Sequence, residues 1–324
     1  MRYTVDVTTA LAFGRNLDTL KSETDDVIQK HLNHILPELF KRILAPVDFY
    51  RWADWKTQGH VKALRKAVDE FVMHARDQLH ADPALRERPR NLIQAMLAAN
   101  EREDAKLSNE EVAGNVLTML LAGEDTTANT LAWLTWLLHR NPDACERARA
   151  EVLEVLAGAP VASSVEQLSD LRVLEACAQE AMRLKPVAPI MINEAAQDTV
   201  VDGVAIPKGA LVLCMMRAAG VSAEHFPAPL EFDPTRWLEG HAAAAGLSSP
   251  KRVVMPFGAG PRMCPGRYLA LAEIKMVASM LLASFELEEV ACEGGAEPPE
   301  RLALTMSPVG LRMRLRPRDA GGAP

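Results

Sequence analysis

The segment between Ser108 and Pro142 constrains the fold more than any other part of the chain, because it predicts one unusually long helix. Ser108 followed three residues later by Glu111 is a capping box, which is typical of a helix N-terminus. His139 and Arg140 stand in the expected last turn, and Pro142 lies just beyond it. The helix has about 30 residues and is roughly 45 Å long at ~1.5 Å per residue. It is apolar nearly all round, so we expect it to run through the middle of the fold.

The centre of this helix departs from the pattern of a buried helix. A glycine, two acids and two hydroxyls follow one another at Gly123, Glu124, Asp125, Thr126 and Thr127. A carboxylate beside an alcohol suits proton transfer when both lie within reach of a reacting atom. The structural alternative is a helix kink in which a threonine hydroxyl bonds the preceding turn. Both interpretations are open at this point.

Most of the remaining pattern is also helical. Apolar spacing predicts helices at 4–13, 24–43, 58–79, 91–99, 142–156 and 165–184. Alternation takes over at 199–213, around turn signals at 202–203 and 208–209, and again at 309–316. The Ala/Gly/Ser-rich stretch 240–249 predicts a surface loop. We therefore expect one mainly α (α+β) domain over 1–324, with small β-sheets in its C-terminal half.

Charge and cysteine usage exclude several classes of protein. The net charge is −7, the opposite of what a nucleic-acid binder usually shows. The five cysteines are scattered and never spaced as Cys-x-x-Cys, which argues against a disulfide framework or a zinc ribbon and for a reducing compartment. No run reaches the ~20 apolar residues of a membrane span, and the first residues are not a signal peptide. We expect a cytoplasmic protein with neither a nucleic acid nor a membrane as partner.

A glycine-rich loop around one cysteine carries the clearest chemical signal. It contains Phe257, Gly258, Gly260, Arg262, Cys264 and Gly266. Glycines let the backbone approach a large flat object closely. Pro265 suits the first position of a helix over 268–284, which would place Cys264 at a helix N-terminus, where a thiolate is favoured. Such a thiolate is a nucleophile or an axial metal ligand; the absence of a histidine nearby in sequence weakens the nucleophile, and a buried structural cysteine is the third alternative.

The loop also carries a resemblance to a known family. The pattern Phe257-x-x-Gly260-x-Arg262-x-Cys264-x-Gly266 resembles the haem-binding loop of the cytochrome P450 family. Three further motifs stand in the order found in that family. They are the oxygen-activation motif at 122–127, the Glu-x-x-Arg helix at 180–183 and the Phe-x-Pro-x-Arg-Trp segment at 232–237. The resemblance covers essentially the whole chain.

The resemblance implies a role for each motif. Cys264 would be the thiolate ligand of the iron of haem b (iron protoporphyrin IX), which favours O–O cleavage. Other residues matching the family's cofactor-binding positions are Ala122, Gly123, Phe257, Gly258, Arg262 and Gly266, with Arg262 paired to a haem propionate. Asp125 and Thr126 would be the catalytic acid–alcohol pair that supplies protons when O2 is activated. Glu180, Arg183 and Arg236 would form a buried structural cluster.

The implied activity is that of a monooxygenase, which inserts one oxygen atom of O2 into a hydrophobic small molecule. Segment 186–192 and the central helix would line an apolar pocket. Electrons would come from a ferredoxin, a flavodoxin or a reductase. Four cations would form its docking surface, namely Lys251, Arg252, Arg267 and Lys275.

The sequence departs from the family at two places. Its first helix resembles one that lies well inside the family's fold, so we expect the N-terminal helices and a substrate-covering loop to be missing from a fragment. Asn193 stands where many members carry a propionate-binding arginine. A non-catalytic haem-binding fragment is therefore the alternative function. A peroxygenase is less favoured, because such relatives often lose the acid–alcohol pair and Asp125-Thr126 is intact.

Overall fold

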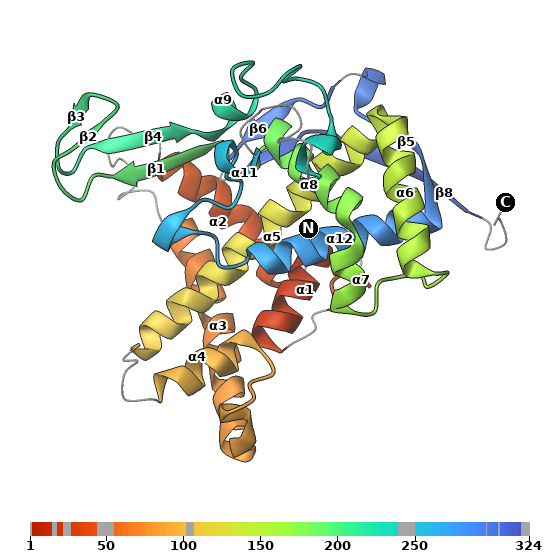
Figure 1. Cartoon of the computed structure of the whole chain (residues 1–324). Coiled ribbons are helices and arrows are strands. Elements are labelled where there is room, and N and C mark those ends of the chain that lie inside the picture. Colours follow the sequence, from red (N-terminus) through yellow and green to blue (C-terminus); the bar gives the residue numbers. More distant parts are fainter. Residues whose placement is uncertain are drawn as a thin grey trace. The chain divides into compact units, whose positions relative to one another are not determined.

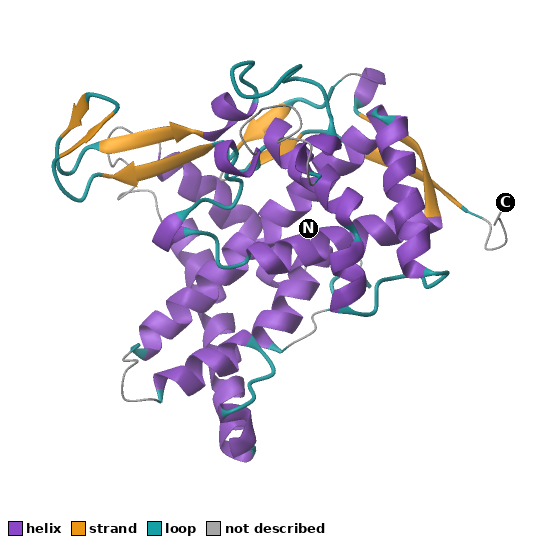
Figure 2. Ribbon diagram, in the orientation of Figure 1, coloured by secondary structure: helices purple, strands orange, loops and turns teal. Residues whose placement is uncertain are grey.

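The computed structural model describes residues 2–14, 18–21, 27–43, 55–101, 107–238, 250–295, 297–303 and 305–318. Two compact units divide the chain, unit 1 (Met1–Ala128) and unit 2 (Asn129–Pro324), and each is described by itself. Helices dominate both, and the strands form small antiparallel sheets (Figures 1 and 2). The expected mainly α fold class is confirmed, while the single domain over 1–324 stays a prediction.

Where unit 1 is described, its regular secondary structure consists of helices. Its helices are α1 (Arg2–Phe13), α2 (Val27–Ile43), α3 (Trp55–Ala81), the short 3-10 helix η2 (Pro83–Arg86), α4 (Leu92–Asn100) and the first part of α5 (Asn109–Arg140). The predicted helices at 4–13, 58–79 and 91–99 are confirmed. The predicted start of the second helix, at 24–26, lies outside the described residues.

The core of unit 1 joins α1, α3, α4 and α5. Phe13 stacks on Phe71 with ring centroids 5.4 Å apart. Ile93 and Val112 are completely buried in the same cluster. Asn91 ends the preceding loop and caps α4, because its side chain accepts a hydrogen bond from the Gln94 amide.

Helix α5 contributes to both units and begins where the sequence predicts. The capping box forms in both directions: the Glu111 amide donates to Ser108 Oγ (3.2 Å), and the Ser108 amide donates to Glu111 Oε2 (2.7 Å). The latter bond, above all, lowers the pKa of Glu111. The helix is continuous through Gly123 to Arg140. It is not buried on all sides, because its first half has exposed positions at Gly114, Asn115, Thr118 and Ala122.

Unit 2 contains the rest of α5 and six further α-helices within the described residues. They are α6 (Pro142–Leu156), α7 (Val165–Asp170), α8 (Arg172–Leu184), α9 (Met216–Gly220), α11 (Pro250–Val253) and α12 (Arg267–Ser284). The prediction of one helix over 165–184 is wrong, because Leu171 leaves the helical region (φ −74°, ψ 69°). The carboxylate of Glu151 in α6 caps the second helix by accepting from the amides of Val173 and Leu174.

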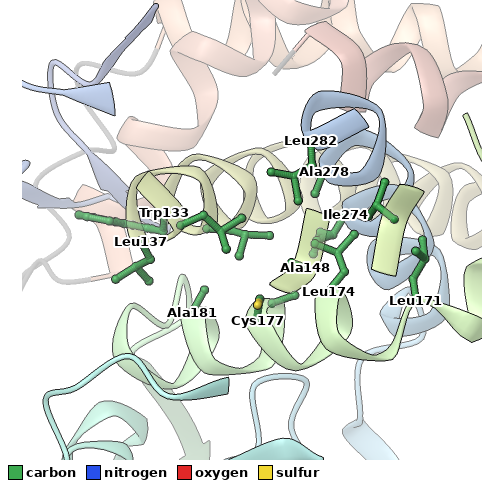
Figure 3. Packing of buried hydrophobic residues seen from close by; sticks show 14 of the residues in the cluster. Trp133, Leu137, Ala148, Leu171, Leu174, Cys177, Ala181, Ile274, Ala278 and Leu282 are labelled. Atoms are coloured by element: carbon green, nitrogen blue, oxygen red, sulfur yellow. The ribbon is translucent and has the colours of Figure 1, made fainter. Parts of the chain in front are cut away.

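Side chains from α5, α6, α8 and α12 make up the core of unit 2 (Figure 3). Trp133, Leu174 and Ala178 are completely buried there. Cys177 points into the same cluster, and burial raises the pKa of its thiol to about 12. The four helices of unit 2 therefore share one continuous apolar core.

Within the described residues of unit 2, the strands form four two-stranded antiparallel sheets. The pairs are β1 (Ile190–Glu194) with β4 (Leu211–Met215), β2 (Thr199–Val201) with β3 (Val204–Ile206), β5 (Phe285–Ala291) with β8 (Arg312–Pro317), and β6 (Glu300–Leu302) with β7 (Met306–Pro308). In Figure 1, the hairpin of β2 and β3 continues the ribbon of β1 and β4. Its turn has positive φ at Asp202 (50°) and Gly203 (79°), as the predicted turn requires. The predicted loop at 240–249 lies outside the described residues.

A fully buried charge cluster joins α8 to the 3-10 helix η3 (Pro234–Trp237). Arg183 binds both carboxylate oxygens of Glu180, at 2.8 and 2.7 Å. It also donates to the carbonyl of Gly220 at the end of α9 and to the carbonyls of loop residues 229 and 231. Glu180 in turn accepts from the Asp233 amide and the Trp237 indole, and Arg236 Nε lies 3.3 Å away. The cluster confirms that these residues are buried together.

None of the described helices is long and apolar enough to cross a membrane.

Candidate functional site

The loop around Cys264 forms a tight turn in unit 2. The Cys264 amide donates to the Phe257 carbonyl at 2.8 Å, and the Met263 amide donates to the Gly260 carbonyl at 3.1 Å. Gly258 (φ 70°) and Gly260 (φ 68°) adopt left-handed backbone, which other residues rarely do. These two glycines are therefore required by the turn itself.

The cysteine side chain is half-buried and lies just ahead of α12. The helix runs over Arg267–Ser284, which confirms the predicted helix over 268–284, but Gly266 is its N-cap and Pro265 is therefore not its first position. The Ala270 amide donates to the Gly266 carbonyl and closes the first turn. A Cβ added at Gly266 would lie 3.9 Å from Cys264 Sγ. Because Gly266 has no side chain, no Cβ lies beside the sulfur.

Strand β1 lies beside this loop. A Cβ added at Gly258 would lie 3.6 Å from Met191 Cε, so Met191 contacts the turn. Met191 pairs with Cys214 across the β1–β4 ladder, and Asn193 pairs with Val212 on the same face. The Asn193 amide points to Cys214 Sγ at 3.7 Å. Of the predicted pocket segment 186–192, Met191 is thereby brought next to the cysteine loop.

The acid–alcohol pair lies in unit 1, on α5. Both Asp125 and Thr126 are half-buried. Thr126 Oγ1 donates to the Ala122 carbonyl at 2.9 Å, which is the back-bond that the structural interpretation of this segment predicts. The bond fixes the rotamer of the threonine and leaves the lone pairs of its oxygen as acceptors.

Two threonines of α1, which the sequence analysis missed, contact this segment inside unit 1. Thr4 Oγ1 donates to the Glu124 carbonyl at 2.9 Å. A Cβ added at Gly123 would lie 3.0 Å from Thr8 Oγ1 and 3.2 Å from Thr8 Cγ2. The sequence holds a weak signal for them, because threonines four residues apart share one face of a helix. That signal does not say which helix the face contacts.

The predicted site residues fall into two groups. Ala122, Gly123, Asp125 and Thr126 belong to unit 1, whereas Phe257, Gly258, Arg262, Cys264 and Gly266 belong to unit 2. Each group is brought together within its own unit. Arg262 is exposed and has no ion-pair partner in the part of the chain that the structure describes.

The prediction that Lys275 belongs to the docking surface is wrong. Lys275 is only 7% exposed and donates to Glu175 Oε2 of α8 at 2.7 Å, so its charge is paired with a partly exposed carboxylate. Arg267 is half-buried and stacks over the Tyr268 ring at 4.3 Å. Lys251 and Arg252 are exposed, as predicted.

Other clusters of unit 1 do not add to the site. His31 and His34 of α2 contact His60 of α3 through their rings. Even so, no group of three or more His, Cys, Asp or Glu side chains in the described ranges is arranged to hold a metal ion. A hollow of about 420 Å³ is lined by residues of α2 and α3, and none of the predicted site residues lines it.

Glu273 of α12 is a buried acid whose charge has no compensation. It is 2% exposed, and its Oε1 has no hydrogen-bond partner among the described residues. Burial raises the pKa of this carboxyl to about 8. The folded chain therefore holds a proton there that the unfolded chain loses above about pH 4.5.

This difference predicts a fall in stability with rising pH. The contribution of the protonated Glu273 to the free energy of unfolding is fully present below about pH 4.5 and is lost between there and about pH 8, on the order of 5 kcal/mol. We expect Glu273→Gln to flatten the decrease in free energy of unfolding measured by urea titration from pH 5 to 9. The exposed Glu154→Gln serves as control and should keep the wild-type slope. Parallel slopes for wild type and Glu273→Gln would contradict the prediction.

Comparison with known proteins identifies a family. The family model described as Cytochrome P450 matches residues 1–313. The cyclooctat-9-en-7-ol 5-monooxygenase of Streptomyces melanosporofaciens is 33% identical over 274 residues, which cover 82% of this chain and 56% of that protein. The pentalenene oxygenase of Streptomyces avermitilis is 27% identical over 299 residues, 91% of this chain and 63% of that protein.

Solved structures agree with the sequence comparison. The crystal structure of the cytochrome P450DA heme domain superposes with a TM-score of 0.83 at 25% identity, covering 98% of this chain and 67% of that one. The beta-amyrin 11-oxidase of Glycyrrhiza uralensis is 28% identical and covers 83% of this chain, but only 54% of its own length is matched. The chain thus spans about half to three-fifths of the length of the curated relatives it matches.

Proposed function

Because the chain belongs to the cytochrome P450 family, we propose that it is a haem-thiolate monooxygenase acting on a hydrophobic organic substrate. The reaction joins one oxygen atom of O2 to a substrate carbon and releases the other as water, which consumes two electrons and two protons. Haem b supplies the oxygen-activating chemistry when bound. The residues of the chain have to hold the haem, orient the substrate and deliver the protons.

The observation that carries this proposal is the half-buried thiol of Cys264 at the end of a glycine turn. The loop residues 259–263 are exposed, so the turn presents a surface that suits a large flat group. A single cysteine thiolate is the protein ligand of a haem-thiolate site, and glycines beside it leave room for the haem. The residues present therefore fit the haem.

Individual residues take the roles that follow from their places. Cys264 is the proposed axial ligand, Phe257 and Gly258 of the same turn are proposed to contact the haem, and Gly266 lies beside the sulfur. Arg262, exposed and without an ion-pair partner among the described residues, is the proposed propionate ligand. Ala122 and Gly123 are proposed to border the haem on the α5 side. Asn193 offers an amide where many relatives carry a cation, which leaves Arg262 as the main positive charge proposed for the propionates.

The test of the proposal is spectroscopic. The purified chain, expressed with haem precursor, is reduced and exposed to CO. We expect the long-wavelength Soret band that gives the family its name. Haem uptake without that band would support the non-catalytic alternative, and no haem uptake at all would overturn the proposal.

Proton delivery gives a second prediction. Asp125 is the proposed proton carrier, and the Thr126 hydroxyl, fixed by its bond to the Ala122 carbonyl, is the proposed partner. We expect Asp125→Asn to lower product formation about 10²-fold, the typical contribution of a general acid. The measurement uses ¹⁸O incorporation from ¹⁸O2 into pentalenene, beta-amyrin or cyclooctat-9-en-7-ol, the compounds for which relatives are named.

A matched control separates chemistry from general damage. Asp170→Asn, at the exposed end of α7, should keep the wild-type rate. Equal turnover by Asp125→Asn and Asp170→Asn would remove Asp125 from the mechanism.

Partners and location follow from the chemistry and the surface. We propose a ferredoxin, flavodoxin or reductase as electron donor, which docks where Lys251 and Arg252 lead into the cysteine loop. We also propose a cytoplasmic location, because the five cysteines show no disulfide framework.

A further inference from the structure

We propose that Thr4 and Thr8 of α1 are positioning residues, which fix the turn of α5 that carries Asp125 and Thr126. The inference rests on the proposed function, because it assigns these threonines a purpose only if the acid–alcohol pair acts on bound oxygen. All the residues concerned lie in unit 1. Neither threonine belongs to a motif named above.

The first observation is a hydrogen bond between two helices. Thr4 is 1% exposed, and its hydroxyl donates to the Glu124 carbonyl at 2.9 Å across 120 residues of sequence. In an α-helix that carbonyl already serves the amide of Ala128, four residues on. A second donor on a mid-helix carbonyl ties this turn of α5 to α1. The carbonyl belongs to the residue directly before Asp125.

The second observation concerns the fit at Gly123. The side chain of Thr8 is 2% exposed and reaches the place where a Cβ of residue 123 would stand, at 3.0 Å from its Oγ1. A Cβ at position 123 would require the Thr8 side chain to shift by a few tenths of an ångström. Gly123 thus admits the Thr8 side chain, and the contact sets how closely α1 approaches.

The two contacts act together on a short stretch of α5. Thr4 holds the carbonyl of residue 124, Thr8 fills the space at residue 123, and Thr126 bonds the carbonyl of residue 122 from within the helix. The carbonyls of residues 122 and 124 are therefore bonded by side chains, and the position between them is packed against Thr8. A proton donor must be held within about half an ångström of its working position, so this support matters for function.

The test replaces the hydroxyl and keeps the shape. Thr4→Val removes the bond to Glu124 without changing the volume, and Thr4→Ser restores a hydroxyl. Thr9→Val is the matched control: Thr9 is completely buried on the same helix, but its hydroxyl bonds the Val5 and Asp6 carbonyls of α1 itself. A general loss of helix packing would affect Thr4→Val and Thr9→Val alike.

Two measurements on the holoprotein follow from this set. In hydrogen–deuterium exchange, the peptide covering 121–130 should exchange about fivefold faster in Thr4→Val, the factor that one net hydrogen bond contributes. Carbon monoxide bound to the reduced haem is the second probe, because its infrared stretching band responds to nearby polar groups. We expect that band to shift or split in Thr4→Val, to return in Thr4→Ser and to stay unchanged in Thr9→Val.

The contact at Gly123 has its own pair of variants. Gly123→Ala should disturb the CO band, and the double variant Gly123→Ala/Thr8→Ala should restore it, because the second change removes the atoms that the new Cβ meets. A double variant as disturbed as Gly123→Ala alone would refute the role of Thr8.

Asp125→Asn keeps the inference distinguishable from the proposed function. Absence of haem uptake overturns the proposed function. If haem binds but Asp125→Asn leaves the CO band unchanged, the placement of the acid near bound oxygen fails, and with it the purpose of the support from Thr4 and Thr8. If Asp125→Asn moves the band while Thr4→Val leaves both band and exchange as in wild type, the positioning role of Thr4 alone is refuted.

Discussion

Replacing Cys264 with alanine is expected to abolish thiolate ligation of haem completely. The side chain is the only group of the glycine turn with the chemistry of a soft, anionic iron ligand. Its half-buried place between Gly258 and Gly266 is set by backbone bonds that do not involve the sulfur, so the loop should survive the change. Cys264→Ala should then be a folded protein without its proposed axial ligand.

The measurement is the CO difference spectrum, together with haem content after gel filtration. We expect no trace of the long-wavelength Soret band in Cys264→Ala and a strong decrease in bound haem. Cys214→Ala is the nearby control, since Cys214 shares the β4 face that carries Val212 and lies opposite Met191. It should keep the full band. An unchanged spectrum in Cys264→Ala would overturn the ligand assignment and the function that depends on it.

Breaking the buried cluster on α8 is expected to cost 3–5 kcal/mol of folding free energy. Arg183→Met removes five hydrogen bonds of a side chain with no solvent exposure. It takes both direct bonds of Arg183 away from the buried Glu180 carboxylate, which then keeps only the Asp233 amide, the Trp237 indole and the more distant Arg236 Nε at 3.3 Å. A loss of this size is a large part of the stability of an ordinary domain.

Urea denaturation followed by circular dichroism measures the loss. The control is Arg149→Met, whose partner Glu146 has the same i,i+3 spacing on a helix but is 66% exposed in its side chain, so less than about 1 kcal/mol is expected. If both variants lose the same small amount of unfolding free energy, the buried cluster does not stabilise the fold. If Arg183→Met fails to accumulate, Arg183→Lys, which keeps the charge, tests the same point.

Features encoded locally could be predicted from the sequence. The start of α5 is correct because its signal, Ser108 with Glu111, consists of the groups that form the cap. The hairpin at 202–203 is correct for the same reason, since turn residues carry their own backbone preference. The glycine turn before Cys264 belongs to this class too.

Features that depend on distant partners could not be predicted from the sequence. The break at Leu171 is stabilised by Glu151, which lies on another helix and looks like any surface acid in the sequence. Lys275 was expected on the surface because of its charge, yet Glu175, 100 residues away, makes its burial possible. Thr4 became visible only when α1 and α5 were seen to share a hydrogen bond.

The burial of Cys177 gives the protein an internal reporter of its own opening. Alkylating reagents react with the thiolate, and a thiol with a pKa of about 12 in a sealed apolar cluster offers almost none. Iodoacetamide should therefore modify Cys177 only in molecules whose core has come apart. Mass spectrometry of that one alkylated peptide would follow the unfolding equilibrium without any added dye or engineered label.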